Sequence, residues 1–164
     1  MSDVDVDPTL NLAAVTDGNR LHIVDVSNPS QPVQLRTVVL PDGASAVAVR
    51  DGFAYVAGRT ALVSVDLVTG EIIQTLPVTL ARLTDVAIEG AGLFTMDQAA
   101  TLWAIELLGA GQMTVRGSLV ASGTGGDIFV GNGIAYMTAA QLGSGGFATA
   151  DVRDLNTPSL FSLS

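Results

Sequence analysis

The sequence predicts an all-β fold, a β-propeller built of four-stranded antiparallel blades, with about four blades in this chain. A phrase of short aliphatic strands separated by polar turns recurs with a period near forty residues. The strand segments are apolar on both faces, and the turns between them hold Gly, Asn, Asp or Pro. Sheets that must be covered on both sides are typical of blades that pack against one another.

The repeat is clearest where a hairpin leads into the second strand of each unit. VRDGFAYVAG (49–58), IEGAGLFTMD (88–97) and VGNGIAYMTA (130–139) are alike, and LNLAAVTD (10–17) is a degenerate relative. The Asp-Gly and Asn-Gly pairs of the second and fourth units suit two-residue hairpin turns. We therefore expect one repeat domain over residues 1–164.

An acid closes the third strand of each unit and sets the period. The separations between these acids are 41, 40 and 45 residues, so the fourth unit carries an insertion. The four acids are Asp25, Asp66, Glu106 and Asp151. Blades are expected at about 1–40, 41–79, 80–120 and 121–164.

The strands within a unit follow from the second repeat. Its inner strand is expected near residues 44–50, followed by strands near 53–58, 61–67 and 71–78. Residues 99–108 come closest to a helical pattern, but they align with the second repeat and are interpreted as a strand. By register, residues 3–9 fall at the place of the first inner strand, and they are a weak inner strand, a linker or an edge. Residues 122–126 (SGTGG) are interpreted as a connector between blades.

Composition limits the function classes. Apolar residues make up 48% of the 164 residues, so the chain can bury a substantial core. Sixteen acids against seven arginines give a net charge of −9, which repels phosphate backbones, so we expect no nucleic-acid partner. No apolar run reaches the length of a membrane span, and the acidic start does not resemble a signal peptide. The lack of cysteine excludes disulfides and thiolate sites.

The first two units carry a resemblance to known families. LHIVDVSNPSQPVQL (21–35) resembles the third strand and turn of LVIVD-repeat propellers, and FAYVA (53–57) and IAYM (134–137) resemble their second strand. Residues 54–78 are equally similar to the YVTN family of bacterial surface propellers, whereas units three and four keep only the spacing. The resemblance implies a module of a larger bacterial secreted or cell-surface protein, and hence an extracellular or cell-surface location.

The number of blades leaves three assemblies open. Closed propellers usually have roughly four to eight blades, so four is the lower end of the range. The chain is a fragment of a longer propeller, a closed four-bladed ring, or one half of a homodimer that completes an eight-bladed ring. A homodimer would cover the apolar faces that an open stack of blades exposes.

Two sets of acids are candidate sites. The acids that close the third strands are expected to accept hydrogen bonds from the N–H groups of the next turn, because a structural position recurs in every blade. Asp3, Asp5 and Asp7 lie on one side of an extended strand, where carboxylates could bind Ca²⁺. The remaining features of a calcium loop are missing, so we expect no cofactor and a charged edge that discourages strand pairing.

The other candidate side chains have structural explanations. His22 is the only histidine, which disfavours a usual zinc site, and it is expected to be a hydrogen-bonded structural residue. Trp103, Tyr55 and Tyr136 occupy repeat positions and are expected to pack between blades. No nucleophile elbow, phosphate loop or His-Glu-x-x-His motif occurs.

The insertion of the fourth unit is the candidate interaction loop. Strand alternation places it on the same face as the connectors between blades, where loop variation on a rigid frame tends to carry function. Its residues are Gln141, Leu142, Gly143, Ser144, Gly145 and Gly146.

The leading hypothesis is a non-catalytic propeller module that acts as a protein-protein or surface-interaction scaffold. The alternative is a propeller enzyme, a lactonase-like hydrolase or quinoprotein-like dehydrogenase with a metal or cofactor at the central channel. Only Asp85, Asp127 and the acids of residues 3–7 approach the axis, so no catalytic, cofactor-binding or metal-binding residue is assigned.

Overall fold

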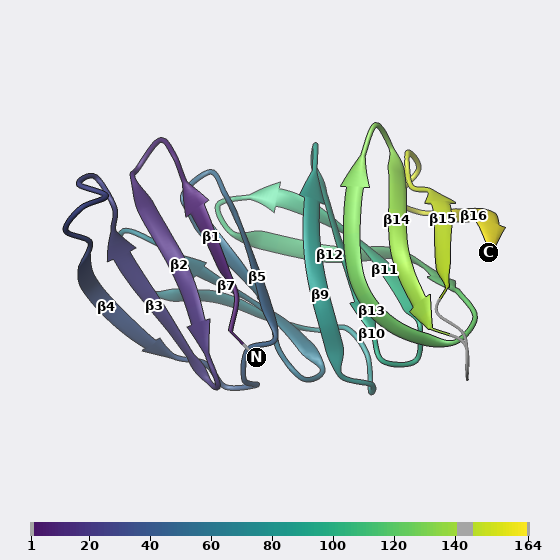
Figure 1. The fold of residues 1–164 in the computed structure, drawn as a ribbon, viewed down its shortest axis with the longest axis horizontal. Coiled ribbons are helices and arrows are strands. Elements are labelled where there is room, and N and C mark those ends of the chain that lie inside the picture. Colours follow the sequence, from purple (N-terminus) through teal and green to yellow (C-terminus); the bar gives the residue numbers. More distant parts are fainter. Residues whose placement is uncertain (1, 141–145, 164) are drawn as a thin grey trace.

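A computed structural model describes residues 2–140 and 146–163, which form four four-stranded antiparallel sheets. Figure 1 shows the strands, each sheet being a meander of consecutive strands. Sheet 1 contains β1 (Val4–Asp7), β2 (Leu12–Asp17), β3 (Arg20–Asp25) and β4 (Val33–Val39). Sheet 2 contains β5 (Ala46–Arg50), β6 (Phe53–Ala57), β7 (Ala61–Asp66) and β8 (Ile72–Pro77). Sheet 3 contains β9 (Leu83–Glu89), β10 (Gly92–Asp97), β11 (Thr101–Gly109) and β12 (Gln112–Val120). Sheet 4 contains β13 (Thr124–Gly131), β14 (Ile134–Ala140), β15 (Phe147–Asp151) and β16 (Ser159–Leu163). The predicted all-β fold is confirmed.

The hairpins form where the sequence allows positive φ at both turn positions. Asp51 and Gly52 have φ of 50° and 82°, and Asn132 and Gly133 have φ of 56° and 72°. Two-residue turns of this kind match the twist of the strands they join. They therefore fix the register of β5 with β6 and of β13 with β14.

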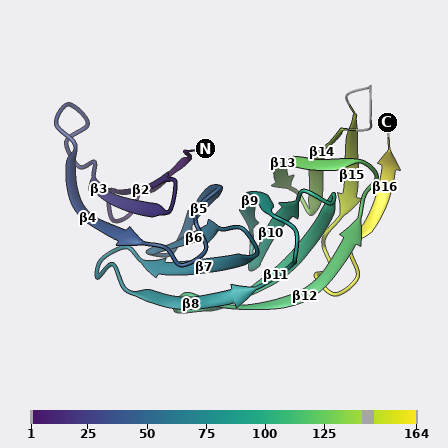
Figure 2. The ribbon, with the colours of Figure 1, turned by 90° about the horizontal axis from the view of Figure 1, so that it is seen from below.

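The sheets follow one another along an arc that is open on one side (Figure 2). The inner strands β1, β5, β9 and β13 line its concave side, and the outer strands β4, β8, β12 and β16 follow its rim. The open arc contradicts the closed four-bladed ring among the assemblies considered from the sequence. The described residues contain no helical segment with the length and hydrophobicity that a membrane span requires.

Each boundary between neighbouring sheets is filled by one apolar cluster. Leu21 and Val63 belong to the cluster between sheets 1 and 2. Tyr55 and Ile105 belong to the cluster between sheets 2 and 3, and Met96 and Met137 to the one between sheets 3 and 4. A sheet that is buried on both faces must have apolar residues on both, which explains the near-continuous apolar runs of β6 and β10.

The strand predictions for the second repeat agree with β5 to β8 within two residues at either end. Of residues 99–108, all but the first two lie in strand β11, as expected from the alignment rather than from periodicity. The connector assigned to residues 122–126 is wrong for its last three residues, which begin β13. A Cβ at Gly125 would lie 1.9 Å from the carbonyl oxygen of Asp97, so glycine lets β13 pass this carbonyl.

Candidate functional site

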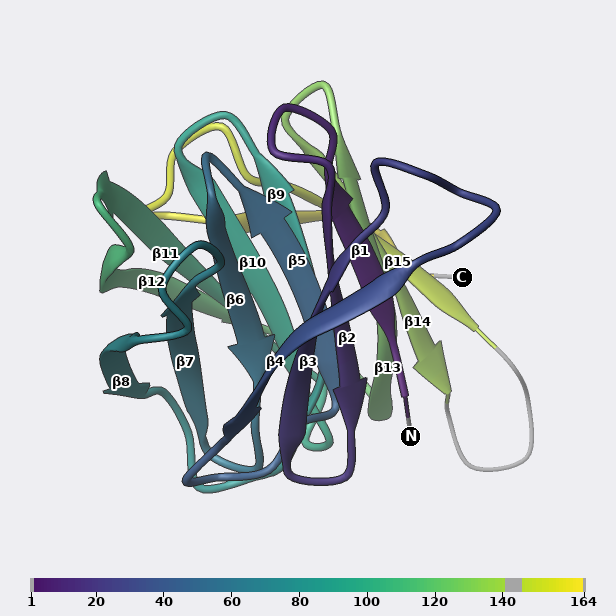
Figure 3. The ribbon, with the colours of Figure 1, turned by 90° about the vertical axis from the view of Figure 1, so that its left-hand side faces the viewer.

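The arc has two loop-bearing faces (Figure 3). The turns that follow the inner strands gather on one of them, and the sheet-to-sheet connections gather on the opposite one, which we call the connector face. Residues 141–145 of the predicted interaction loop lie outside the described residues, and Gly146 directly precedes β15. The function assigned to this loop stays a prediction.

Three of the four repeated acids accept hydrogen bonds from the next turn, as predicted. Asp25 accepts from the N–H of Ser27 at 2.8 Å, and Asp66 accepts from the N–H groups of Val68 and Thr69, both at 2.8 Å. The side chain and N–H of Ser27 lower the pKa of Asp25. These contacts give the two acids a structural role in the turns that follow the third strands.

The fourth sheet repeats this contact and the third does not. Asp151 accepts from the N–H of Arg153 at 3.1 Å, and its ion pair with the Arg153 side chain lowers its pKa to about 2. Glu106 instead pairs across the strands with Arg116, whose Nε lies 2.8 Å from a Glu106 oxygen. The turn-capping role predicted for Glu106 is therefore wrong, because its longer side chain reaches the neighbouring strand.

The acids of the first strand hold sheet 1 to sheet 2. Asp3 and Asp5 accept hydrogen bonds from the N–H groups of Val47 and Val49 in β5, at 2.9 and 2.6 Å. They share one side of β1, as predicted, but they do not repel a neighbouring strand. The carboxylates supply acceptors for N–H groups on the inner edge of β5, and the predicted edge-blocking role stays a prediction.

Asp7 completes this ladder at the turn side. Its buried carboxylate accepts from the N–H groups of Thr9, Leu10 and Gly52 at 2.8, 3.0 and 2.8 Å. The Leu10 N–H is the main cause that lowers the pKa of Asp7, with Gly52 and Thr9 acting in the same direction and burial opposing them. The carboxylate therefore ties the β1–β2 turn to the β5–β6 turn.

The boundary between sheets 3 and 4 uses the same device. Asp85 in β9 accepts from the N–H of Ile128 at 2.8 Å, and Glu89 accepts from the N–H groups of Asn132 and Gly133. Burial raises the pKa of Asp85, and the carboxylates of Asp127 and Asp3 add to the effect, while the N–H groups of Ile128 and Val86 oppose it. Asp85 thus lies near the axis, as predicted, but it is engaged in sheet packing.

Asp97, which sequence reasoning did not single out, is the most enclosed carboxylate of the chain's described part, with 1% exposure. One oxygen accepts from the N–H groups of Ala99 and Thr101, at 2.9 and 3.0 Å. The other accepts from Thr79 Oγ1 and Trp103 Nε1, at 2.8 and 3.0 Å. The sequence does contain a signal that could have identified Asp97. It aligns with Gly58 of the second repeat, so a carboxylate occurs at this repeat position in the third unit but not in the second.

The histidine and aromatic predictions are mostly confirmed. His22 Nδ1 lies 3.0 Å from Thr37 Oγ1, which gives it a structural partner. Tyr55 is buried in the cluster between sheets 2 and 3, and Trp103 packs against that cluster. Tyr136 does not pack between blades as predicted: it lies 46% exposed on the outward face of sheet 4, with its ring 6.2 Å from that of Phe129.

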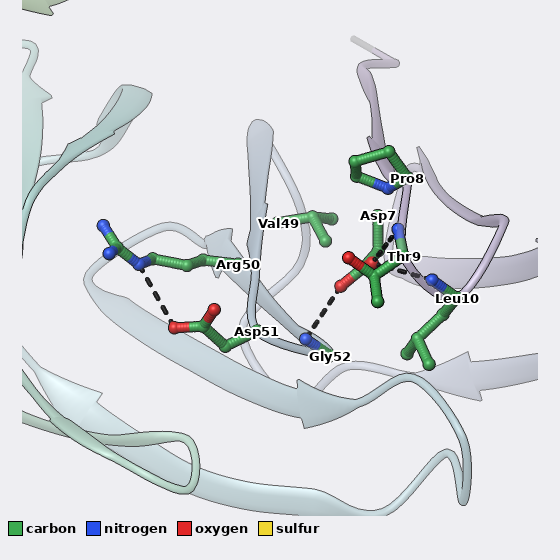
Figure 4. Close-up of a pocket in the computed structure, with 8 residues that line it drawn as sticks. All are labelled: Asp7, Pro8, Thr9, Leu10, Val49, Arg50, Asp51 and Gly52. Atoms are coloured by element: carbon green, nitrogen blue, oxygen red, sulfur yellow. Dashed lines mark hydrogen bonds and ion pairs between the residues drawn. The ribbon is translucent and has the colours of Figure 1, made fainter.

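Two hollows lie beside the inner strands. One of 660 Å³ follows the concave side of β1, β5, β9 and β13 and includes Asp3, Asp5 and Asp85. The other, of 480 Å³, lies between the β1–β2 and β5–β6 turns. Figure 4 shows Asp7 bonded to both turns there, whereas Arg50 extends away from Asp7 and pairs with Asp51 at 3.3 Å. Within the described residues, no cluster of three or more His or acidic side chains is arranged to hold a metal.

A third hollow, of 430 Å³, opens on the connector face. Sheets 2, 3 and 4 each contribute to its lining, which consists of Ser45, Arg82, Thr84, Gln98, Gly125, Gly126 and Asp127. Arg82 Nε donates to Ser45 Oγ at 3.2 Å, and Thr84 Oγ1 donates to the carbonyl of Gly126 at 2.7 Å. These bonds hold a guanidinium group at the junction of three sheets.

Comparison with solved structures supports the fold. The chain superposes on a functionally unknown protein from Desulfotomaculum acetoxidans DSM 771 with a TM-score of 0.84 at 13% identity, covering 98% of this chain and 55% of that one. The computationally designed Ika8 protein gives 0.78 at 13% identity, covering 98% and 48%. Kuenenia stuttgartiensis hydrazine synthase gives 0.77 at 14% identity, covering 97% and 48%. The chain thus spans about half the length of these proteins.

Comparison of sequences finds a family match in the first two sheets. No curated protein matches the chain. Two segments match the LVIVD repeat, and they cover β2 to β4 and the region from the start of sheet 2 to the end of β7. The resemblance of LHIVDVSNP and FAYVA is thereby confirmed for residues 11–38 and 43–67, which match the LVIVD repeat, a repeat of the β-propeller type.

Proposed function

We propose that this chain is a non-catalytic β-propeller module that binds a protein or surface partner through its connector face. The observation that carries the proposal is the engagement of the inner-strand carboxylates. Asp3, Asp5 and Asp85 each accept a backbone N–H of the next sheet. A carboxylate that joins two sheets is poorly placed to bind a metal or to move a proton on a substrate.

The hollow on the connector face supports the choice of this face as the binding surface. It presents the guanidinium of Arg82 and the amide of Gln98 beside the half-buried backbone of Gly125 and Gly126. In a chain of net charge −9, an arginine at the meeting point of three sheets favours a partner segment that carries a carboxylate or free carbonyl oxygens. The insertion of residues 141–146 is expected to contribute to the same surface.

The setting of the module is part of the proposal. LVIVD repeats imply a larger bacterial secreted or cell-surface protein, and this chain spans about half the length of its structural neighbours. We place the module outside the cytoplasm on that basis, as a binding unit that needs no cofactor.

The proposal is tested by partner capture from envelope and secreted fractions of a bacterium that encodes the chain. Arg82→Ala and the exchange of residues 141–146 for a short turn are each expected to reduce capture of a specific partner at least about tenfold. The first removes charge-assisted contacts, and the second removes the uncharged contact surface of the loop. Arg116→Ala is the matched control, since Arg116 lies on the outer strand β12 and pairs with Glu106. Equal capture by all four proteins would contradict the assignment of the connector face.

Metal analysis of the purified protein separates this function from the enzyme alternative. We expect less than stoichiometric Ca²⁺ and other divalent metals after purification in their presence. A stoichiometric metal whose binding is lost in Asp85→Asn would instead support a catalytic centre at the axis and overturn the non-catalytic proposal.

A further inference from the structure

The first and last sheets each leave one apolar face uncovered. On sheet 4 this face, here the leading face, carries Phe129, Tyr136 and Phe147, which are 66%, 46% and 53% exposed. On sheet 1 it is the trailing face, and it carries Val4 and Val6, which are 58% and 42% exposed. Large apolar side chains that are exposed together on a protein surface typically mark an interaction site.

The leading face of sheet 4 occupies the register positions that are buried inside the stack. Phe129 pairs with Tyr136, and Thr138 pairs with Phe147. The equivalent pairs of sheet 2 are Ala48 with Tyr55 and Ala57 with Leu62. Ala48, Tyr55 and Leu62 are only 8%, 3% and 0% exposed, because they pack on sheet 3. The three exposed rings of sheet 4 therefore stand where an intersheet cluster belongs.

The trailing face of sheet 1 is the surface on which the leading face of another sheet would pack. Val4 pairs with Val15 in β2, as Val86 pairs with Thr95 in sheet 3. Val86 is 7% exposed because sheet 2 packs on it, whereas Val4 is 58% exposed. The two ends of the stack are thus the two halves of one repeated contact, each without its partner.

Figure 2 shows that both uncovered faces lie at the ends of the arc and open toward the same side. We infer that a second copy of this chain closes the arc about a two-fold axis along the propeller channel. The leading face of each copy then packs on the trailing face of the other. The two contacts are identical, and the assembly is complete with two copies because the rotation closes.

A second copy fits this space better than an unrelated partner for two reasons. The required surface is the next sheet of the same repeat, and the chain's own sheet 1 presents it. The chain also covers only 55% and 48% of two structural neighbours, so two copies supply about the length of one such protein. This inference is independent of the proposed function, because a dimer could bind any partner or none.

The oligomeric state of the 164-residue chain tests the inference directly. Light scattering after size exclusion is expected to give about twice the 16.7 kDa chain mass at micromolar concentration. A chain mass of one copy over this range would overturn the inference, and so would a mass that grows with concentration without reaching a plateau, because that indicates open stacking.

Two charge substitutions identify the faces. Phe129→Glu on the leading face and Val4→Glu on the trailing face are each expected to weaken dimerisation at least about 100-fold, because each buries a charge at both contacts. Val68→Glu is the matched control, since Val68 is also 58% exposed but lies in the turn between β7 and β8. Circular dichroism checks that all three variants keep the strand content.

A mixture of the two variants distinguishes the proposed contact from its competitor. Phe129→Glu keeps an intact trailing face and Val4→Glu an intact leading face, so mixing them is expected to restore part of the dimer. A dimer formed by two leading faces would instead be abolished by Phe129→Glu, unaffected by Val4→Glu and not rescued by mixing. A Val4→Glu variant that dimerises normally, or a mixture that shows no recovery, would overturn the inference. A dimer that survives both substitutions would overturn it as well.

Discussion

The boundary between sheets 1 and 2 and the boundary between sheets 2 and 3 make the same packing contact with different chemistry. At the first, Asp3, Asp5 and Asp7 of the inner strand accept the backbone N–H groups of β5 and its turn. At the second, the equivalent positions are Ala46, Ala48 and Arg50, and the two alanines are buried in the apolar cluster. The geometry of a blade stack therefore does not require a particular inner-strand residue.

The second boundary has a two-way amide contact at its rim. Gln74 of β8 donates from Nε2 to the carbonyl of Met113 at 3.0 Å and accepts from its N–H at 2.6 Å. A single amide thus satisfies both backbone groups of one residue in the next sheet. Both boundaries also have a polar contact at the other side: Arg36 Nε donates to the carbonyl of Val68 at 3.2 Å at the rim of the first, and the Arg50 guanidinium donates to the carbonyl of Gly90 beside the inner strands of the second. The difference is that the inner strand of the first boundary supplies carboxylate acceptors, whereas that of the second supplies a guanidinium donor, so each boundary has directional contacts in addition to apolar burial.

Among the substitutions that test the difference between the two boundaries, removal of the Asp7 carboxylate is expected to lower stability the most. Asp7→Ala leaves three N–H donors without their acceptor at a side chain that is 5% exposed, which should lower the free energy of unfolding by about 3 kcal/mol. Urea denaturation at fixed protein concentration measures the change. Asp51→Asn, at a carboxylate that is 84% exposed on the facing turn, is the control and should change stability little, because Asn tolerates the positive φ of 50° at this position. Similar losses in both variants would show that the axis is not fastened by this carboxylate.

The comparison also shows what the sequence could and could not predict. The period, the turn residues and the two-sided apolar strands predicted the sheets, because these signals are local. The partners of Asp3 and Asp5 lie 44 residues away in the chain, so their role depends on how two sheets stack. Alternation placed them on one side of β1 but could not show that β5 lies there.

Asp97 and Tyr136 show the same limit of prediction from the sequence: Asp97 has a partner that the sequence did not indicate, and Tyr136 lacks the packing that it did indicate. Asp97 looks like an ordinary strand-end acid, yet its partners include Thr79, which belongs to the connection from the preceding sheet. Tyr136 aligns with the buried Tyr55, but sheet 4 has no following sheet within the described part of the chain, so its ring is exposed. A repeat alignment predicts equivalent positions, and the ends of the stack are where equivalence fails.

Removal of Gln74 tests the rim contact of the second boundary. Gln74→Ala is expected to lower the free energy of unfolding by about 1–2 kcal/mol, because both backbone groups of Met113 lose their partner in a partly buried contact. Gln34→Ala is the matched control, since the Gln34 amide lies exposed on β4 and bonds only to Thr37 within the described residues. A loss no greater than that of the control would indicate that the Gln74 contact does not contribute to holding sheets 2 and 3 together.

The smallest effects should appear in the pH dependence, where the carboxylates of the first and third boundaries differ in sign. The folded pKa of Asp7 lies below its usual 3.8, so its stabilising contribution is present above that value and is lost as the pH falls through the folded pKa. The folded pKa of Asp85 lies above 3.8 because of burial, so its favourable contribution is present below that value and is lost as the pH rises through the folded pKa.

Asp7→Asn and Asp85→Asn therefore make a matched pair. As the pH rises from about 3 to about 7, Asp7→Asn should lose stability relative to the unmodified protein, whereas Asp85→Asn should gain relative to it. The amide oxygen that Asp85→Asn introduces can still accept the N–H of Ile128, so the variant removes the charge and keeps the intersheet contact. Urea midpoints measured across this range give both slopes. Slopes of the same sign would mean that the two boundaries use their carboxylates in the same electrostatic environment, and the burial of Asp85 beside Asp127 and Asp3 would then carry no cost.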